Sequence, residues 1–501
     1  MTSPKRAVVV GAGFGGLALA IRLQSAGYNT VLLEKRDKPG GRAYVYEDQG
    51  FVFDAGPTVI TDPTCLEELF ALSGRRMADY VELLPVTPFY QLHWADGTTF
   101  DYVNDQAQLD RQIASMSPRD VDGYRRFLAY SEALLEEGYV KLGHVPFPDF
   151  RSMVRVAPQL IALQSYRSVY AKVSSYLTNE KLRQAFSFHS LLVGGNPFAT
   201  SAIYALIHAL ERKWGVWFPR GGTGSLIRGL VRLFEDLGGK IHLSSPVGRI
   251  STSNGAVTGV ITEDGRSFPA GIVASNADVV HTYTKLLADE PRATSTARSL
   301  TAKRFSMSLF VIYFGLRRSH PQLEHHMVLF GPRYKGLITE IFSGSKLPSD
   351  FSLYLHAPSV TDPSLAPPGC STYYVLSPVP HLGHAAIDWS IEGPRYRDTI
   401  LRYLEERVIP GLRADLVTCR IFTPNDFCHE LNAHLGSAFS LEPILTQSAY
   451  FRAHNADKRV EGLYLVGAGT HPGAGIPGVV GSAKATAGII IEANPPQAGM
   501  S

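Results

Sequence analysis

The sequence predicts an α/β protein, and three features near its start support this fold class. The apolar run Ala7–Val10 is short enough for a buried strand and leads directly into the glycine-rich turn Gly11–Gly16. Residues 17–23 then follow a helical pattern, and Thr30–Leu33 forms a second apolar run that ends on Glu34. A strand, a glycine turn, a helix and a second strand in this order form the βαβ unit of a Rossmann-like, dinucleotide-binding fold.

Each glycine of the turn has a physical role in such a unit. Gly11 permits the tight turn, Gly13 lets the backbone approach a pyrophosphate, and Gly16 lets the helix pack closely on the strand. The helix N-terminus offers free N–H groups to the phosphates. Glu34 can accept hydrogen bonds from a ribose 2′-hydroxyl and would repel a 2′-phosphate. An ordinary strand–helix turn is the alternative, but the complete order of elements favours a site for an ADP-containing dinucleotide other than NADP.

A second glycine turn, Asp37–Ala43, follows Glu34 and carries a cation, and Phe53–Thr58 comes soon after it. In these segments the sequence resembles the superfamily of flavin-dependent amine oxidases and carotenoid desaturases. The resemblance implies that the dinucleotide is FAD. It also implies contacts with FAD at Lys35, Gly41, Arg42, Pro57 and Thr58.

Length and composition limit the other classes of function. The 501 residues suffice for two or three domains, and a hydrophobic content of 45% supplies their cores. A net charge of +3 gives no electrostatic reason to expect a nucleic-acid partner. The four cysteines form no CxxC pair and the 16 histidines no HxxxH or HExxH pattern. We therefore expect no metal site, and reduced thiols in a cytoplasmic protein. No apolar run of about 18 residues is apparent, so we expect no membrane-spanning segment.

The chain is expected to form a FAD-binding domain from separated segments, a mixed β-sheet substrate-binding domain and a helical subdomain. The FAD-binding domain is assigned to residues 1–78, 219–285 and 441–501. Residues 79–105 and 286–440 contain hairpin and strand patterns and are assigned to the substrate-binding domain.

Residues 106–218 follow helical patterns and are assigned to the helical subdomain. Within it, Phe150–Asn179 contains basic and many apolar residues but no Asp or Glu. Such a stretch predicts a basic amphipathic surface that meets anionic lipid headgroups. The alternative is a basic, solvated face of the subdomain. On the first interpretation, the subdomain associates with a membrane.

The C-terminal residues return to the FAD-binding domain. Leu463–Val466 is a buried strand, and the glycine-rich segment 467–483 leads into a helix. Gly473–Gly478 matches GxGxxG, but no second strand with a ribose acid follows, so we reject a second nucleotide site. We expect this loop and helix N-terminus to close on the flavin, where the helix dipole stabilises negative charge on the reduced ring. No cysteine is near, which predicts non-covalent FAD. The resemblance implies further contacts at Val247, Gly469, Thr470, Gly478 and Val479.

Three longer motifs narrow the resemblance: Ser190–Phe198, Trp217–Gly222 and the tail Leu463–Ala483. With these, nearly the whole chain is similar to the family of bacterial-type phytoene desaturases, and Thr470 stands where amine oxidases usually carry Glu. The resemblance implies FAD-dependent desaturation of phytoene towards lycopene, by hydride transfer to the flavin and proton loss. It also implies a long apolar polyene as substrate and a cytoplasmic enzyme bound peripherally to the membrane.

Several roles stay open. A hydrocarbon offers no hydrogen-bonding handle, so we expect few polar groups in the pocket. Arg151 and Arg155, one helical turn apart, are candidates for catalytic polar groups at the tunnel or for a surface pair near headgroups. Because one complete dinucleotide fingerprint is present, oxygen or a quinone is expected to reoxidise the flavin. The alternative functions are an amine or porphyrinogen oxidase, a carotenoid isomerase that uses reduced FAD, and, least favoured, a non-catalytic binding module.

Overall fold

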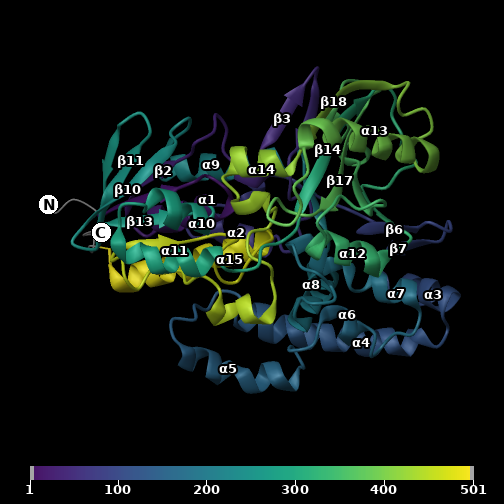
Figure 1. Ribbon diagram of the computed structural model, residues 1–501, viewed down its shortest axis with the longest axis horizontal. Coiled ribbons are helices and arrows are strands. Elements are labelled where there is room, and N and C mark those ends of the chain that lie inside the picture. Colours follow the sequence, from purple (N-terminus) through teal and green to yellow (C-terminus); the bar gives the residue numbers. More distant parts are fainter. Residues whose placement is uncertain (1–4, 497–501) are drawn as a thin grey trace.

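The computed structural model describes residues 5–496, and two large β-sheets with helices around them form its framework. A five-stranded sheet lies on the left in Figure 1 and a seven-stranded sheet on the right, with a group of helices below it. The five-stranded sheet is parallel throughout, in the order β19-β13-β1-β2-β9. Its strands are β1 (Arg6–Val10), β2 (Asn29–Leu33), β9 (Lys240–His242), β13 (Ile272–Ser275) and β19 (Leu463–Leu465).

Both faces of the parallel sheet are buried, which explains the uninterrupted apolar runs of its strands. Val9 and Leu32 pack against helices on one face, whereas Val8 and Val31 pack into a separate core on the other face. The first face is covered by α1 (Phe14–Ser25), α2 (Thr64–Ala71), α9 (Thr223–Asp236) and α15 (Ile476–Ala493). The second is covered by α10 (Val279–His281), α11 (Thr294–Thr301) and the antiparallel strands β10 (Val247–Ser253), β11 (Ala256–Thr262) and β12 (Ser267–Pro269).

The three segments predicted to form the FAD-binding domain all contribute strands to the parallel sheet. Residues 1–78 supply β1 and β2, residues 219–285 supply β9 and β13, and residues 441–501 supply β19. The Rossmann-like arrangement expected from the first βαβ unit is therefore present. The exact domain boundaries stay predictions.

One helix among the described residues, α15, is long and apolar enough to cross a membrane. The expectation of no membrane-spanning segment stays a prediction, because length and composition alone do not show that α15 crosses a membrane. It counted uninterrupted apolar residues, whereas α15 contains glycine, serine and threonine among them. In the structure α15 packs on α1, and its residues Val480, Ala483 and Ile490 are buried in the core beneath the parallel sheet. In this structure α15 is therefore a helix of the core that covers the parallel sheet.

The seven-stranded sheet is mixed, as predicted, in the order β18-β14-β17-β16-β15-β6-β7. All neighbouring strands are antiparallel except β15 and β6, which run parallel. Its strands are β6 (Tyr90–Trp94), β7 (Thr99–Tyr102), β14 (Ser308–Leu316), β15 (His326–Phe330), β16 (Leu353–His356), β17 (Ser371–Val379) and β18 (Leu416–Phe422). One face packs on α13 (Trp389–Arg407), and the other turns towards the helical region and α12 (Tyr334–Ser343).

Short antiparallel pairs and one further helix join these parts. They are β3 (Val45–Asp48) with β4 (Phe51–Asp54), β5 (Leu83–Pro85) with β8 (Trp217–Pro219), and α14 (Pro424–Leu431).

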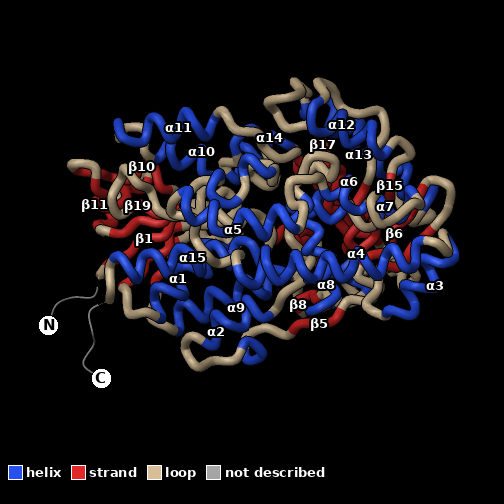
Figure 2. The backbone as a smooth tube through the Cα atoms, turned by 90° about the horizontal axis from the view of Figure 1, so that it is seen from below, coloured by secondary structure: helices blue, strands red, loops and turns tan. Residues whose placement is uncertain are grey.

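The region 106–218 is largely helical, as the sequence predicts. Its helices are α3 (Gln106–Met116), α4 (Asp120–Leu134), α5 (Phe150–Ala162), α6 (Val169–Val173), α7 (Glu180–Ala185) and α8 (Leu206–Trp214). Helix α5 is the outermost of them: it lies at the lower edge in Figure 1 and across the near face in Figure 2. Every residue of α5 is at least partly exposed. This helix is the outward-facing element of the region.

The basic surface predicted for Phe150–Asn179 is narrower than expected. Lys172 is buried, with its ammonium 4.4 Å from the ring centroid of Tyr130 and 3.2 Å from Oε1 of Gln164. The composition of a segment does not show which of its side chains are buried. Here the aromatic rings of Tyr130 and Tyr176 cover Lys172. The exposed basic residues of α5 are Arg151 and Arg155.

Candidate functional site

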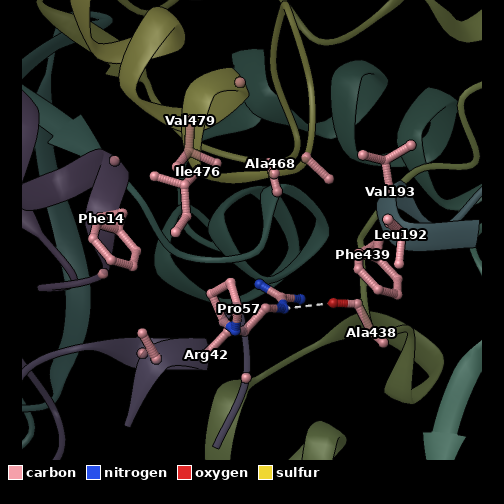
Figure 3. A pocket seen from close by; sticks show the side chains of 18 of the residues that line it. Phe14, Arg42, Pro57, Leu192, Val193, Ala438, Phe439, Ala468, Ile476 and Val479 are labelled. Atoms are coloured by element: carbon pink, nitrogen blue, oxygen red, sulfur yellow. Dashed lines mark hydrogen bonds between the residues drawn. The ribbon is translucent and has the colours of Figure 1, made fainter. Parts of the chain in front are cut away.

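A cavity of about 850 Å³ extends from the parallel sheet to the mixed sheet. At one end it is lined by residues at the carboxyl ends of β1, β2 and β13, the place where open parallel sheets bind ligands. At the other end it is lined by apolar side chains of the mixed sheet and the helical region, including Phe188, Leu210, Val328 and Phe330. We call these the nucleotide end and the apolar end. Figure 3 shows the region between them, with Arg42 and Pro57 opposite Ile476 and Val479.

The glycine turn is packed as tightly as the sequence predicts. Gly11 has a φ of 95°, and a Cβ at Gly16 would lie 1.9 Å from the carbonyl oxygen of Gly11. The lack of a side chain at Gly16 lets α1 approach β1 closely. Gly16 itself does not line the cavity. Helix α1 starts after Gly13 without a side-chain cap, so its first N–H groups are free to bind phosphate oxygens.

Glu34 lies at the cavity wall and is buried. Its Oε2 accepts a hydrogen bond of 2.7 Å from the N–H of Ala12, and its Oε1 accepts one of 3.0 Å from the N–H of Arg36. These bonds hold the carboxylate at the end of β2, where a ribose would lie. Lys35 Nζ donates to the carbonyl oxygen of His429 at 2.9 Å, and burial lowers the pKa of Lys35. Val247, the first residue of β10, lines the same end.

Arg42 lies in the middle of the cavity and is half-buried. Its Nε donates to the carbonyl oxygen of Ala438 at 2.6 Å (Figure 3), and burial lowers the pKa of Arg42. Thr58, beside it in the wall, has Oγ1 within 2.8 Å of the hydroxyl of Tyr374 and 3.2 Å of the hydroxyl of Tyr354. Both tyrosines belong to the mixed sheet, so Thr58 joins the nucleotide end to the apolar end.

The C-terminal loop closes the cavity as expected, with one difference. Gly478 and Val479 line it, and α15 begins after Gly475 without a side-chain cap. Gly469 and Thr470 do not line it: Thr470 is fully buried, and its Oγ1 lies 2.6 Å from Oγ of Ser482. Thr470 therefore stabilises the loop through Ser482 and does not line the cavity itself. Apart from these two residues and Gly16, every predicted cofactor residue lines the cavity.

These residues fit a dinucleotide. Two helix N-termini without side-chain caps face one cavity, an acid stands where a ribose is expected, and a half-buried arginine lies between them. None of the four cysteines, all within residues 5–496, lines the cavity. The residues that would hold the cofactor are thus those of the α1 and α15 N-termini, Glu34 and Arg42.

The two candidate catalytic arginines lie elsewhere. Arg151 and Arg155 are exposed on α5, and neither belongs to the cavity wall. This is the surface location that the sequence left as the alternative; a role in catalysis stays a prediction.

Sequence reasoning missed several residues of the wall. Asn276 lies next to Gly11, and its Nδ2 donates to the Gly11 carbonyl oxygen at 3.3 Å. The apolar run Ile272–Ala274, which ends two residues before Asn276, was a signal in the sequence that could have indicated this position. Tyr354, Tyr374 and Glu211 also line the cavity, but their neighbours in sequence contain no pattern that indicates this.

Three buried histidines, His325, His326 and His356, come together beside Tyr354, with one ring nitrogen of each within 4.8 Å of the others. Strands β15 and β16 pair His326 with His356, which spacing along the chain could not reveal. Burial lowers the pKa of His325 to about 3 and the pKa values of the other two well below the ordinary range, so all three are neutral. The expectation of no metal site stays a prediction.

Comparison with known proteins agrees with this geometry. The family model for flavin containing amine oxidoreductases matches residues 14–491. The chain is 65% identical over 488 residues to a phytoene desaturase (lycopene-forming) of Pantoea ananas, covering 97% of this chain and 99% of that protein. It is 66% identical over 488 residues to a protein of the same name from Pseudescherichia vulneris, with the same coverage.

Among solved structures, an oxidoreductase from Methanosarcina mazei has the same fold. Its TM-score is 0.65 at 19% identity, and the match covers 95% of this chain and 98% of that chain. The family match confirms that the cofactor is a flavin and that the protein is an oxidoreductase. The chain therefore belongs to the family of flavin containing amine oxidoreductases, in the same branch as the two phytoene desaturases.

Proposed function

We propose that the protein is an FAD-dependent phytoene desaturase that introduces double bonds into phytoene and proceeds to lycopene. The observation that carries this proposal is the similarity, over nearly the whole chain, to two lycopene-forming phytoene desaturases. The cavity supports it, because a nucleotide end and an apolar end open into one another.

The residues of the nucleotide end suit a non-covalent FAD. The N-terminus of α1 would bind the pyrophosphate, and Glu34 would accept hydrogen bonds from the adenosine ribose. The N-terminus of α15 would face the flavin ring with its positive dipole end. When bound, the flavin supplies the hydride acceptor, and the protein supplies orientation and a dry pocket.

The apolar end suits a hydrocarbon chain. Its walls come from both the mixed sheet and the helical region, including Leu309, Val311, Val328 and Phe188. These side chains hold an apolar chain by contact and exclude water, which would otherwise compete for a reactive cationic carbon. Orientation then depends on the shape of the tunnel, because the substrate has no polar handle.

We further propose that the substrate enters from a membrane past α5. Met153 and Leu160, on one side of this helix, line the cavity, whereas Phe150, Val154 and Ile161 are exposed. A C40 hydrocarbon has a negligible concentration in water, since each CH₂ contributes roughly 0.8 kcal/mol. Transfer from lipid into an apolar tunnel avoids that cost. Arg151 and Arg155 would then face anionic headgroups on the cytoplasmic side, with the protein bound peripherally.

Turnover of phytoene in liposomes tests the proposal. The purified protein, supplied with oxygen or a quinone and no nicotinamide nucleotide, should convert phytoene to products that absorb at longer wavelength. The matched control is the Gly16→Ala variant, in which the new Cβ would collide with the Gly11 carbonyl oxygen. Isomerised product without new double bonds would indicate a carotenoid isomerase. Hydrogen peroxide release with an amine or a porphyrinogen, and no reaction with phytoene, would indicate an oxidase.

A further inference from the structure

We propose that Glu211 is the base that accepts the proton released when each double bond forms, and that Tyr90 and His189 hold its carboxylate in place. This inference rests on the proposed function, because it assigns a residue to the proton loss that follows hydride transfer.

Glu211 belongs to α8, is fully buried and lines the apolar end of the cavity. The other carboxylates of the wall lie at the nucleotide end or beside Arg42. Among these, Glu430 pairs with Arg36 at 2.7 Å, and Asp278 accepts a hydrogen bond from the N–H of Val280. Among the residues that the structure describes, Glu211 is thus the carboxylate placed against the hydrocarbon part of the cavity.

The contacts of Glu211 keep it available as a proton acceptor. The hydroxyl of Tyr90 donates to Oε1 at 2.7 Å. Nε2 of His189 lies 3.1 Å from Oε2, but neither atom has a well-aligned hydrogen bond within the described structure. A fully buried carboxylate with one oxygen that lacks a well-aligned hydrogen bond lowers the free energy of unfolding. Such groups are common at functional sites.

Tyr90 is a donor and not a second base. Burial raises the pKa of Tyr90 well above its ordinary value, and the charge of Glu211 raises it further. The phenol therefore keeps its proton and stabilises the carboxylate. The hydroxyl thus holds Oε1 of Glu211 at a fixed position in the wall.

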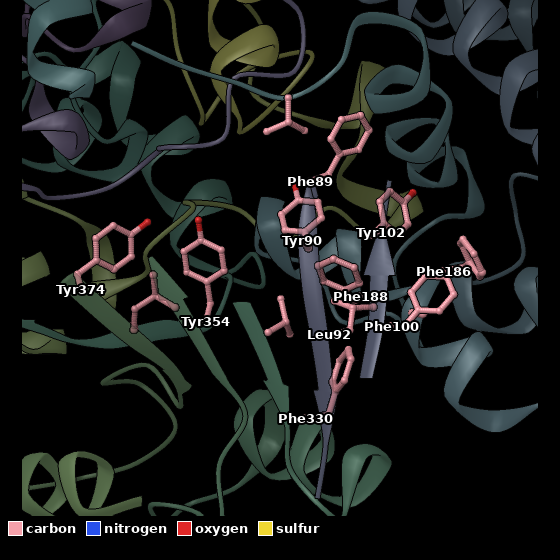
Figure 4. Close-up of a cluster of buried hydrophobic side chains, with 14 of the residues drawn as sticks. Phe89, Tyr90, Leu92, Phe100, Tyr102, Phe186, Phe188, Phe330, Tyr354 and Tyr374 are labelled. Atoms are coloured by element: carbon pink, nitrogen blue, oxygen red, sulfur yellow. The ribbon is translucent and has the colours of Figure 1, made fainter. Parts of the chain in front are cut away.

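Side-chain contacts connect Glu211 with the middle of the cavity. Thr58, beside Arg42, is bonded to Tyr354, and Tyr354 is bonded to Nδ1 of His326 at 2.6 Å. The ring centroid of His326 lies 5.8 Å from that of Tyr90. Figure 4 shows Tyr354 and Tyr90 in one row with their hydroxyls directed the same way. The carboxylate therefore belongs to the polar part of an otherwise apolar wall, which a bound polyene would pass.

With a bound flavin as the hydride acceptor, a hydride would leave one allylic carbon with both electrons of its C–H bond. On the adjacent carbon the C–H bond breaks, its electron pair forms the new π bond, and its proton forms an O–H bond on Glu211. The proton is shared with Nε2 of His189 and passes to water when the product has left. Oxygen or a quinone would finally take up the two electrons that the hydride carries.

Reduction of the bound flavin by phytoene, measured anaerobically by absorbance over a range of pH, tests this role. Glu211→Gln should keep its FAD content, its melting temperature and its binding of phytoene, and should be reduced on the order of 10²–10⁴-fold more slowly. The matched control is Glu442→Gln. Glu442 is also a buried acid, paired with Arg304 at 2.9 Å, but it lies outside the cavity wall. That control should stay within threefold of the wild-type rate.

Tyr90→Phe provides a second measurement that does not depend on the stability of the glutamine variant. It removes the hydrogen bond that orients the carboxylate, so flavin reduction should slow on the order of 10–100-fold while the FAD content and the binding of phytoene stay unchanged. A Tyr90→Phe rate or a Glu211→Gln rate within threefold of wild type overturns the role of Glu211 and leaves the proposed function intact. A wild-type protein that phytoene does not reduce overturns both.

Discussion

Removal of the apolar side chains from the outer side of α5 should release the protein from membranes. Phe150, Val154 and Ile161 have exposed fractions of 56%, 54% and 62%, so slightly more than half of each residue is available to lipid. At about 1.5–3 kcal/mol for complete burial of such a side chain, insertion contributes about 1–2 kcal/mol each and about 3–5 kcal/mol in total. The triple serine variant should therefore partition into liposomes on the order of 10²–10⁴-fold less.

Flotation with liposomes of anionic lipid measures this difference. The matched control is Ile391→Ser, since Ile391 has an exposed fraction of 52% but lies on α13, at the far side of the molecule from α5 (Figure 1). Charge reversal at Arg151 and Arg155 should add a salt-sensitive loss, at about 1 kcal/mol per residue near an anionic leaflet. If the triple serine variant floats as well as Ile391→Ser, the membrane contact lies elsewhere and the entry route past α5 is wrong.

Further predictions concern the cofactor. Glu34→Arg should weaken FAD binding by on the order of 2–4 kcal/mol, because a buried acceptor is lost and a cation introduced; unchanged FAD affinity by titration would contradict the assignment. Gly16→Ala should yield protein without yellow colour after gel filtration, since its Cβ has no room between α1 and β1. Acid precipitation of the native protein should release all flavin into the supernatant, because the cysteines lie outside the cavity. Turnover should not change when NAD or NADP is added or withheld, and an absolute need for either would refute the single-nucleotide site.

Local features were predictable from the sequence. The turn from Gly11 to Gly16, the strand that ends on Glu34 and the helical region after residue 106 depend on neighbours within a few turns or strands. Their chemistry is present in short segments, so residue type and spacing suffice. The parallel sheet built from separated segments followed from the same patterns together with the family resemblance.

Contacts between distant residues were not predictable in this way. Tyr90 and Glu211 are 121 positions apart, and strand pairing that no spacing encodes brings His326 next to His356. The burial of Lys172 depends on aromatic rings from a neighbouring helix as well as its own segment. In each case the decisive information is which surfaces face one another, which a single sequence does not contain.

The position of β19 in the parallel sheet has a consequence for synthesis of the chain. β19 pairs with β13 at the sheet edge, and α15 covers α1, although both elements follow β13 only after the last strands of the mixed sheet. At roughly 5–20 residues per second, a ribosome needs on the order of tens of seconds to add them after β13. During this interval the edge of β13 and one side of α1 remain uncovered and open to wrong pairing. Capture of the cofactor therefore has to wait until β19 and α15 have been made, and chaperones that shield nascent chains should improve the yield of yellow protein.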